Sequence, residues 1–324
     1  MKRILVTGGT GFVGANLVRR LHQLGHEVHL IVRPGSDTWR LASLVRAFNI
    51  HTAALEDAES IRRIVRQVKP SWIFHAAAYG GYAAHRDLYQ MIATNFMATV
   101  HLVQASLEVG CEAFINTGSS SEYGFRDHPP TESEALEPNS HYAVTKAAAS
   151  LFCRYTAQTE RVCIRTLRLY SVYGPYEPPT RLIPTLLLKA RRGTYPPLVA
   201  PNVARDFIYV DDVVNAYLLA VRHPTRHPDG IYNVGMGVQS SLKQVVDLTR
   251  KLLHVRAVPR WGEMKNRSWD TAVWVANTNL SRRELGWAPK VSLRKGLQLT
   301  LEWFESNPDV LKRYEKEQRA AKRS

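Results

Sequence analysis

The sequence predicts an α/β fold: a doubly wound parallel sheet, followed by a smaller mixed lobe built from the C-terminal part of the chain. Short apolar runs alternate with helical patterns through the first two-thirds of the 324 residues. The runs are continuously apolar, which is typical of parallel strands covered by helices on both faces. The length suits two modest domains, or one large domain with an appendage.

The elements of this sheet follow one another in a regular order. Strands are predicted at residues 3–7, 27–32, 50–54, 71–77, 112–118 and 162–169. Helices, in which apolar residues recur three and four positions apart, are predicted at residues 12–25, 43–50, 58–68, 88–110 and 140–158.

Proline and glycine become frequent after Pro175, and we place a domain boundary there. Residues 1–175 are expected to form the first domain, to which residues 206–235 return with a strand and a helix. Residues 176–205 and 236–324 are expected to form the second lobe. Helices are predicted in it at residues 241–253, 278–285 and 293–305.

Composition limits the class of function. The net charge of +15 favours anionic partners, but the basic residues are scattered and accompany no recognisable nucleic-acid-binding motif. No apolar run approaches the ~18 residues needed to span a membrane. We therefore expect neither a nucleic acid nor a membrane as partner.

The cysteines indicate the compartment. Cys111, Cys153 and Cys163 are odd in number and show no CxxC spacing. This pattern argues against a disulfide framework and against a zinc site. We expect a cytoplasmic protein without a metal.

A glycine-rich turn, TGGTGFVG, separates the first predicted strand from the first helix. Gly8, Gly11 and Gly14 allow a tight turn and close backbone approach, and the helix that starts at Phe12 and Val13 offers free N–H groups to a pyrophosphate. In this context the pattern predicts a dinucleotide site of the Rossmann type.

The end of the second strand predicts which dinucleotide binds. An acidic residue there would bind the ribose hydroxyls of NAD, but the strand ends in Val32-Arg33. Arg33 can instead meet a 2′-phosphate, and Arg40 lies nearby. NADP is therefore favoured, with NAD as the alternative.

Tyr142 and Lys146 lie four residues apart at the start of a predicted helix, and hence on one face. A free phenol has a pKa near ~10, and a neighbouring ammonium lowers it. The preceding strand ends in a run of serines, Ser119 to Ser121. In a parallel sheet, strand ends and the starts of the following helices share one edge. A hydroxyl, a phenol and an ammonium are therefore predicted to converge there.

With these motifs, the chain resembles the extended short-chain dehydrogenases/reductases that act on nucleotide sugars. The resemblance covers nearly the whole length. It includes TGGTGFVG (7–14), HAAA (75–78), Asn95, GSSSEYG (118–124), YAVTK (142–146), LRLYSVYGP (167–175), RDFIYVDDVV (205–214) and ELGWAPK (284–290). Its C-terminal half is most similar to 4-ketoreductases of the CDP-abequose synthase type.

The resemblance implies roles for particular residues. Tyr142 would be the acid/base, Lys146 its support, and Ser119 the assisting hydroxyl, with Ser120 as an alternative in register. The cofactor residues would be Gly8, Gly11, Phe12, Val13, Gly14, Arg33, Ala76, Ala77, Tyr142 and Lys146. The substrate residues would be Tyr79, Ser120, Ser121, Arg181, Arg205 and Arg267. Helices 88–110 and 140–158 would form a homodimer interface.

Two departures from the family pattern are informative. Members that dehydrate the sugar carry an Asp-Glu pair directly after the assisting hydroxyl, where this chain has Ser120 and Ser121. Serines cannot supply the acid and base for eliminating water, so a dehydratase is not expected. Ala54 also stands where many members have an aspartate that contacts adenine.

The expected activity is NADPH-dependent reduction of the C4 ketone of a nucleotide-linked 4-keto-6-deoxy sugar. An NAD-dependent 4-epimerase is the alternative within the enzyme class. A non-catalytic nucleotide- or nucleic-acid-binding protein is the alternative from another class. His75 is interpreted as a packed histidine, Asn95 as structural, and Asp211 and Asp212 as helix-capping acids.

Overall fold

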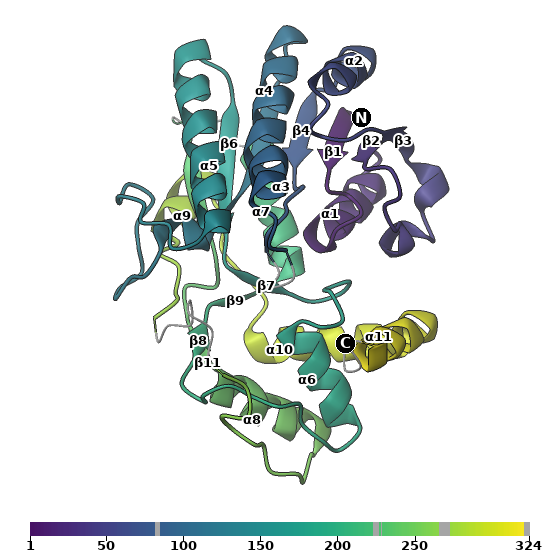
Figure 1. The fold of residues 1–324 in the computed structure, drawn as a ribbon, viewed down its shortest axis with the longest axis vertical. Coiled ribbons are helices and arrows are strands. Elements are labelled where there is room, and N and C mark those ends of the chain that lie inside the picture. The colour runs from purple at the N-terminus through teal and green to yellow at the C-terminus, as the bar shows by residue number, and fades with distance from the viewer. Residues whose placement is uncertain (82–84, 223–226, 228, 266–272, 321–324) are drawn as a thin grey trace.

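The computed structural model describes residues 1–81, 85–222, 227, 229–265 and 273–320. Within them a parallel sheet of seven strands forms the centre of the larger layer, in the order β10-β6-β5-β4-β1-β2-β3 (Figure 1). The strands are β1 Arg3–Thr7, β2 Glu27–Val32, β3 Asn49–Thr52, β4 Trp72–His75, β5 Ala113–Ser119, β6 Ile164–Leu169 and β10 Ile231–Val234.

Helices cover both faces of the sheet, as the continuously apolar strands predict. Helices α1 (Phe12–Gln23) and α7 (Val210–Arg222) pack on one face. The other face carries α2 (Ala58–Val68), α4 (Ala98–Glu108) and α5 (His141–Glu160). Successive residues of a strand point to opposite faces, so Ile4 and Val6 join the first core and Leu5 the second.

The second lobe lies beyond the carboxyl ends of the strands (Figure 1). Its helices are α6 (Leu182–Arg191), α8 (Leu242–Leu253), α10 (Leu293–Ser306) and α11 (Pro308–Ala320), which share a third core. Two short pairings stand apart from the large sheet: β7 (Ser171–Tyr173) with β9 (Phe207–Tyr209), and β8 (Ala204–Arg205) with β11 (Ser240–Ser241). Helix α9 (Asn279–Leu285) packs against β10.

Some elements differ from the sequence-based predictions. The helix predicted at 43–50 is wrong: the region holds only the 3-10 turns η1 (Trp39–Leu41) and η2 (Val45–Ala47) before β3. Phe48 is its only buried residue, so a helix there would have no apolar face to pack. The strand of segment 206–235 pairs with β7, whereas α7 and β10 of that segment join the large layer.

The helix predicted at 88–110 is present but interrupted. It runs as α3 (Leu88–Ile92), a π-helical turn η3 (Ala93–Met97) and α4. Helices α6 and α11 were not predicted. No described helix is long and apolar enough to cross a membrane.

Asp212 makes contacts that its predicted capping role does not include. Asp211 and Asp212 do lie in the first turn of α7. The Asp212 carboxylate, however, accepts hydrogen bonds from the backbone N–H groups of Lys290 and Val291, at 3.0 and 2.9 Å. It therefore anchors a distant segment of the chain to α7.

Candidate active site

The glycine-rich turn brings two strand ends into close contact. Gly8 has a φ of +70°, and a Cβ added to it would lie 2.5 Å from the carbonyl carbon of Ala76 and from the amide nitrogen of Ala77. The amide of Gly11 donates to the carbonyl of Gly8 at 2.9 Å. Only glycine fits at position 8, and the predicted cofactor residues that follow β1 and β4 lie together.

The start of α1 is open to an anion. Gly11 is the N-cap, no side chain caps the helix, and its first turn contains no acidic residue. Phe12 and Val13 begin the helix, so their backbone N–H groups have no intrahelical partner. An uncapped N-terminus beside a glycine turn fits the pyrophosphate of a dinucleotide.

Arg33 lies just past the end of β2 and is exposed. The pKa of His85 is lowered mainly by burial and also by the positive charge of Arg33. The His85 ring stacks on Tyr79, with the ring centroids 4.3 Å apart. The cation predicted to favour NADP therefore lies near the loop that follows β4.

Lys146 is buried under the start of α5. Its side chain is 1% exposed, and its Nζ makes no hydrogen bond within the described residues. Burial lowers its pKa, while the negative charge of Glu122 acts in the opposite direction. A buried ammonium without a hydrogen-bond partner costs free energy, and ribose hydroxyls of a dinucleotide would satisfy it.

Tyr142 lies one helical turn before Lys146 and is half-buried. Helix α5 begins at His141, with the Ser140 hydroxyl accepting the N–H of Ala143 at 3.2 Å. A Cβ on Gly80 would lie 3.0 Å from Cδ2 of the Tyr142 ring. The loop after β4 therefore lies directly against the phenol.

Ser119 ends β5 and caps the short turn η4 (Ser120–Tyr123). Its Oγ lies 2.8 Å from the Oγ of Ser121 and accepts the N–H of Ser121 at 3.2 Å. Ser121 is half-buried, whereas Ser120 is 7% exposed. The structure thus places a pair of hydroxyls at the end of the strand.

Glu122, which the sequence analysis did not identify, holds this serine turn in place. Its Oε1 accepts the backbone N–H of Ser119 at 2.7 Å and the hydroxyl of Ser150 at 3.0 Å. Its Oε2 pairs with Nε of Arg168 at 2.8 Å, and both side chains are almost completely buried. One carboxylate thus joins β5, β6 and α5.

Asn95 ties the loop after β4 to α5. It lies in the π-helical turn, accepts the N–H of Tyr79 at 2.8 Å and donates to the Tyr79 carbonyl at 2.7 Å. Its amide also donates to Thr145 at 2.9 Å. This agrees with the structural role expected for Asn95, and it fixes the position of the loop against the phenol.

His75 is packed between two threonines. Its ring nitrogens lie 2.6 Å from Oγ1 of Thr7 and 3.1 Å from Oγ1 of Thr99. Burial, followed by the charge of Lys146, lowers its pKa to about 3. It is therefore a neutral interior residue.

Two of the three arginines expected to hold substrate lie in the described part of the second lobe. Arg181 is the N-cap of α6, and its Nε lies 3.6 Å from the carboxylate of Glu177. Arg205 lies on β8, over the ring of Trp274 at 5.3 Å. Arg267 lies outside the described residues.

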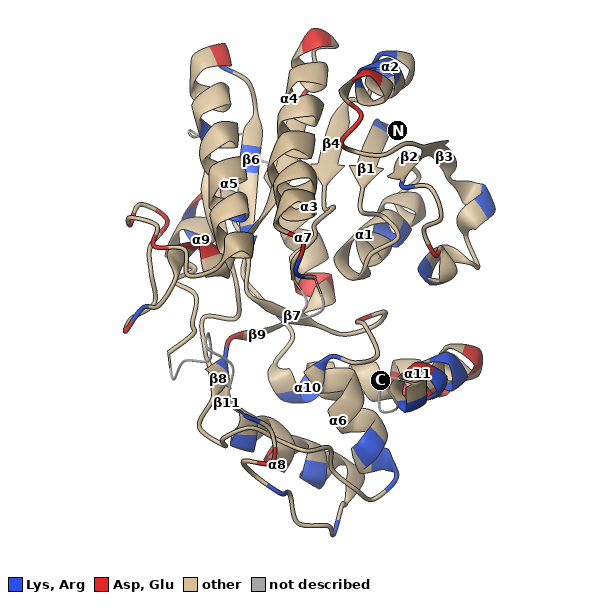
Figure 2. Cartoon of the chain, in the orientation of Figure 1, with Lys and Arg blue, Asp and Glu red and all other residues tan. Residues whose placement is uncertain are grey.

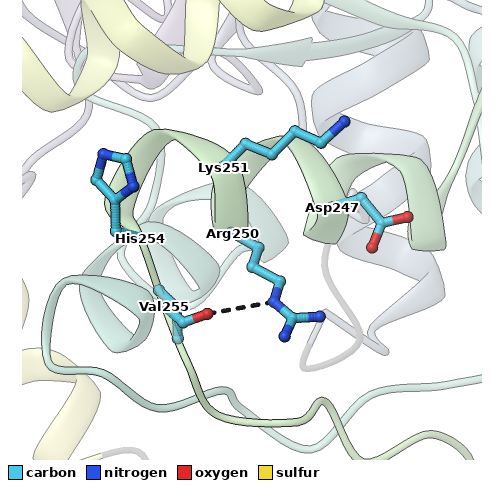
Figure 3. A pocket seen from close by; sticks show the side chains of 5 residues that line it. All are labelled: Asp247, Arg250, Lys251, His254 and Val255. Atoms are coloured by element: carbon cyan, nitrogen blue, oxygen red, sulfur yellow. Dashed lines mark hydrogen bonds between the residues drawn. The ribbon is translucent and has the colours of Figure 1, made fainter.

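A shallow hollow of about 480 Å³ lies elsewhere, on α8 (Figure 3). Asp247, Arg250, Lys251, His254 and Val255 line it, and Arg250 donates to the Val255 carbonyl at 3.2 Å. It contains none of the predicted site residues and does not bear on the chemistry of the serine, phenol and ammonium.

Comparison with known proteins agrees with this geometry. Residues 4–235 match the family described as "NAD dependent epimerase/dehydratase family". The chain is 29% identical to a dTDP-glucose 4,6-dehydratase of Streptomyces griseus, with 94% of each chain covered. It is 26% identical to a CDP-abequose synthase of Salmonella muenchen, with 94% of this chain and 98% of the relative covered.

A solved structure is also similar over most of the chain. The UDP-glucose 4-epimerase of Thermotoga maritima, crystallised with UDP-glucose, superposes with a TM-score of 0.84 at 27% identity, covering 94% of this chain and 98% of the epimerase. The family match, the structural similarity, the glycine turn and the Tyr142–Lys146 helix all agree. The chain therefore belongs to the NAD dependent epimerase/dehydratase family, whose members are extended short-chain dehydrogenases/reductases.

Proposed function

We propose that the protein reduces the C4 ketone of a nucleotide-linked 4-keto-6-deoxy sugar with NADPH. The observation that carries this proposal is Lys146, a buried ammonium without a hydrogen bond in the described residues, one turn below the half-buried phenol of Tyr142. Such a pair supports proton transfer to a carbonyl oxygen at neutral pH.

In the proposed reaction, Tyr142 donates a proton to the carbonyl oxygen. The Ser119 hydroxyl donates a hydrogen bond to the same oxygen, with Ser121 beside it as a partner at 2.8 Å. Lys146 stabilises the phenolate and binds ribose hydroxyls. The reduced dinucleotide, when bound, supplies the hydride.

NADP is the cofactor that the residues at the end of β2 support. Arg33 is exposed there, and neither of its neighbours, Val32 and Pro34, is acidic. A guanidinium suits a 2′-phosphate, while a carboxylate would suit the ribose hydroxyls of NAD. Gly8, Gly11, Phe12, Val13 and Gly14 would hold the pyrophosphate.

Reduction agrees better with the serine turn than dehydration does. Ser120 and Ser121 occupy the positions after Ser119, and neither side chain is an acid or a base near neutral pH. The one carboxylate of that turn, Glu122, is 0% exposed and already bonded to Arg168.

A 4-epimerase is the second candidate, favoured by the similarity to the Thermotoga maritima UDP-glucose 4-epimerase.

We propose that the nucleotide-sugar site lies between Tyr142 and the second lobe, with Tyr79, Arg181, Arg205 and Arg267 contributing. The three cysteines are free, in keeping with the proposed cytoplasmic location.

The test is a turnover assay with a panel of 4-keto-6-deoxy sugars linked to CDP, dTDP, GDP or UDP. We expect the reduced-nicotinamide absorbance to fall in proportion to the product formed. An epimerase would instead carry NAD through purification and interconvert sugars without net consumption of NADPH. Mass spectrometry of the ligands that copurify separates these outcomes.

We also propose a homodimer, formed through α3 and α5. Tyr89 and Ile92 of α3 are 82% and 38% exposed, and Leu151 and Tyr155 of α5 are 44% and 66% exposed. Exposed apolar residues gathered on neighbouring helices are typical of an interface. Light scattering should give a dimer mass for the wild type and for Val258→Glu, a control in the other lobe, but a monomer mass for Leu151→Glu/Tyr155→Glu.

A further inference from the structure

The C-terminal helix α11, on which Figure 2 shows basic and acidic residues together, contacts the loop that follows β2. Arg313 of α11 pairs with the carboxylate of Asp37, 276 residues earlier in the chain. The same carboxylate accepts the N–H of Trp39 at 2.9 Å. The loop of residues 33–38 carries Arg33, the cation expected at the 2′-phosphate.

Two guanidinium groups lie over the ring of Trp39. Arg313 lies 4.8 Å from the centre of its ring, and Arg40 lies 4.4 Å from it. The edge of Tyr314, also of α11, completes the contact, with the ring centroids 5.9 Å apart. Stacking of guanidinium groups on an indole adds to the attraction of the ion pair.

Arg40 connects Trp39 to the glycine-rich turn through its hydrogen bonds. Its Nε donates to the Tyr176 carbonyl at 2.9 Å, and its Nη1 donates to the Thr10 carbonyl at 3.4 Å. Thr10 lies inside the turn expected to hold the pyrophosphate. One continuous set of contacts thus joins α11, the loop after β2 and the phosphate-binding turn.

Besides these contacts, the loop has an internal hydrogen bond from the N–H of Ser36 to the Arg33 carbonyl at 3.1 Å. Arg33, Pro34 and Gly35 are exposed, and a Cβ added to Gly35 would meet no atom within 4 Å. Helix α11 is itself firmly placed: Tyr314 is 0% exposed, and Gln318 donates to the Pro179 carbonyl at 2.7 Å. A fixed helix is therefore bonded to an exposed loop.

We infer that Arg313 is a positioning residue for the cofactor. Together with Asp37 and Trp39 it forms a brace that holds the loop of residues 33–38 in place for the adenosine end of NADPH. This inference rests on the proposed function, because it assumes that the dinucleotide binds across the glycine turn. Ordering a flexible segment when a ligand binds weakens the affinity, and the brace orders this loop before the ligand arrives.

The experiment compares Arg313→Ala, Arg313→Lys and the control Lys312→Ala. Lys312 lies on the same helix, its side chain is 77% exposed, and it pairs with Asp309 three residues earlier. Dissociation constants for NADPH and for 2′,5′-ADP, which carries only the adenosine end, are measured by calorimetry. Amide hydrogen exchange of residues 33–41 is measured on the same proteins without ligand.

We expect Arg313→Ala to weaken both ligands about three- to tenfold, as the ordering cost implies. Turnover at saturating NADPH should stay unchanged, and exchange at residues 33–41 should become faster. Arg313→Lys should recover most of the affinity, and Lys312→Ala should match the wild type.

Unchanged amide exchange in a folded Arg313→Ala variant would overturn the brace. Faster exchange with unchanged affinity for both ligands would overturn its link to the cofactor. Wild-type protein that binds neither NADPH nor NAD would instead overturn the proposed function, while the exchange measurement would still decide whether the brace exists.

Discussion

Tyr142 is the residue on which the proposed chemistry depends most directly. Tyr142→Phe removes the proton donor and leaves the ring and its packing against the loop after β4. We expect turnover to fall about 10²- to 10⁴-fold, the usual contribution of general acid catalysis. The affinity for NADPH should change little. Turnover close to that of the wild type would contradict the assignment.

Glu122 provides a prediction about pH. Its charge raises the pKa of Lys146 against the larger, opposite effect of burial. Glu122→Gln removes that charge and leaves Arg168 unneutralised nearby, so the pKa of Lys146 should fall further. The alkaline limb of the turnover–pH profile should therefore move to lower pH.

The matched control for Glu122 is Glu132→Gln. Glu132 is also a buried carboxyl that feels the charge of Arg168, but it does not act on Lys146. Its profile should stay in place. If both variants fold and the Glu122→Gln profile coincides with that of the wild type, Glu122 has only a packing role.

Individual site residues could be predicted from the sequence where the chemistry of the side chain coincides with a short local motif. Ser119, Tyr142 and Lys146 stand in short motifs, and the helical period alone puts the last two on one face. Glu122 stands in the same serine motif. Its role depends on a hydrogen bond from Arg168, which lies 46 positions later in the chain. The two residues come together because β5 pairs with β6. No local pattern shows such a partner.

Among the elements, the end of β2 allows a test of cofactor choice. Arg33→Asp places an acidic residue where it would bind ribose hydroxyls and repel a 2′-phosphate. We expect the ratio of NADPH to NADH affinity to fall about 10- to 100-fold, since a hydrogen bond to a charged group contributes ~1.5–3 kcal/mol. Arg46→Asp, an exposed change on η2, is the control and should leave the ratio unchanged.

The elements that the sequence predicted well are those with a strong apolar pattern. Strands β1, β2, β4, β5 and β6 bury nearly continuous runs, and α1, α2 and α5 bury one helical face. Helix α11 escaped prediction because only Tyr314 of its residues is buried. The helix predicted at 43–50 failed although its apolar residues are periodic: only Phe48 is buried, and Leu44 packs against the same core while partly exposed.

For the whole molecule, Glu177 predicts how stability depends on pH. The carboxyl is buried in the loop after β7, and burial raises its pKa from 4.5 to about 8. Above pH 4.5 the unfolded chain releases this proton, while the folded chain keeps it until about pH 8. The contribution of Glu177 to stability is therefore present below pH 4.5 and is lost as the pH rises to about 8.

Glu177→Gln removes this dependence. Its free energy of unfolding should exceed that of the wild type at pH 8.5 by more than at pH 5, because each unit of pKa corresponds to about 1.4 kcal/mol. Urea denaturation at the two pH values measures the difference. The exposed change Glu305→Gln should show no such dependence, and equal gains at both pH values would be contrary to the prediction.

The order in which the strands occupy the sheet also bears on how the chain is made. Strand β10 pairs with β6 but is translated 62 residues after it, behind the first helix of the second lobe. Until Ile231–Val234 leaves the ribosome, β6 is an edge strand whose backbone groups on one side have no partner strand. Synthesis therefore exposes a strand that other chains could pair with, and a fragment ending near residue 205 should aggregate.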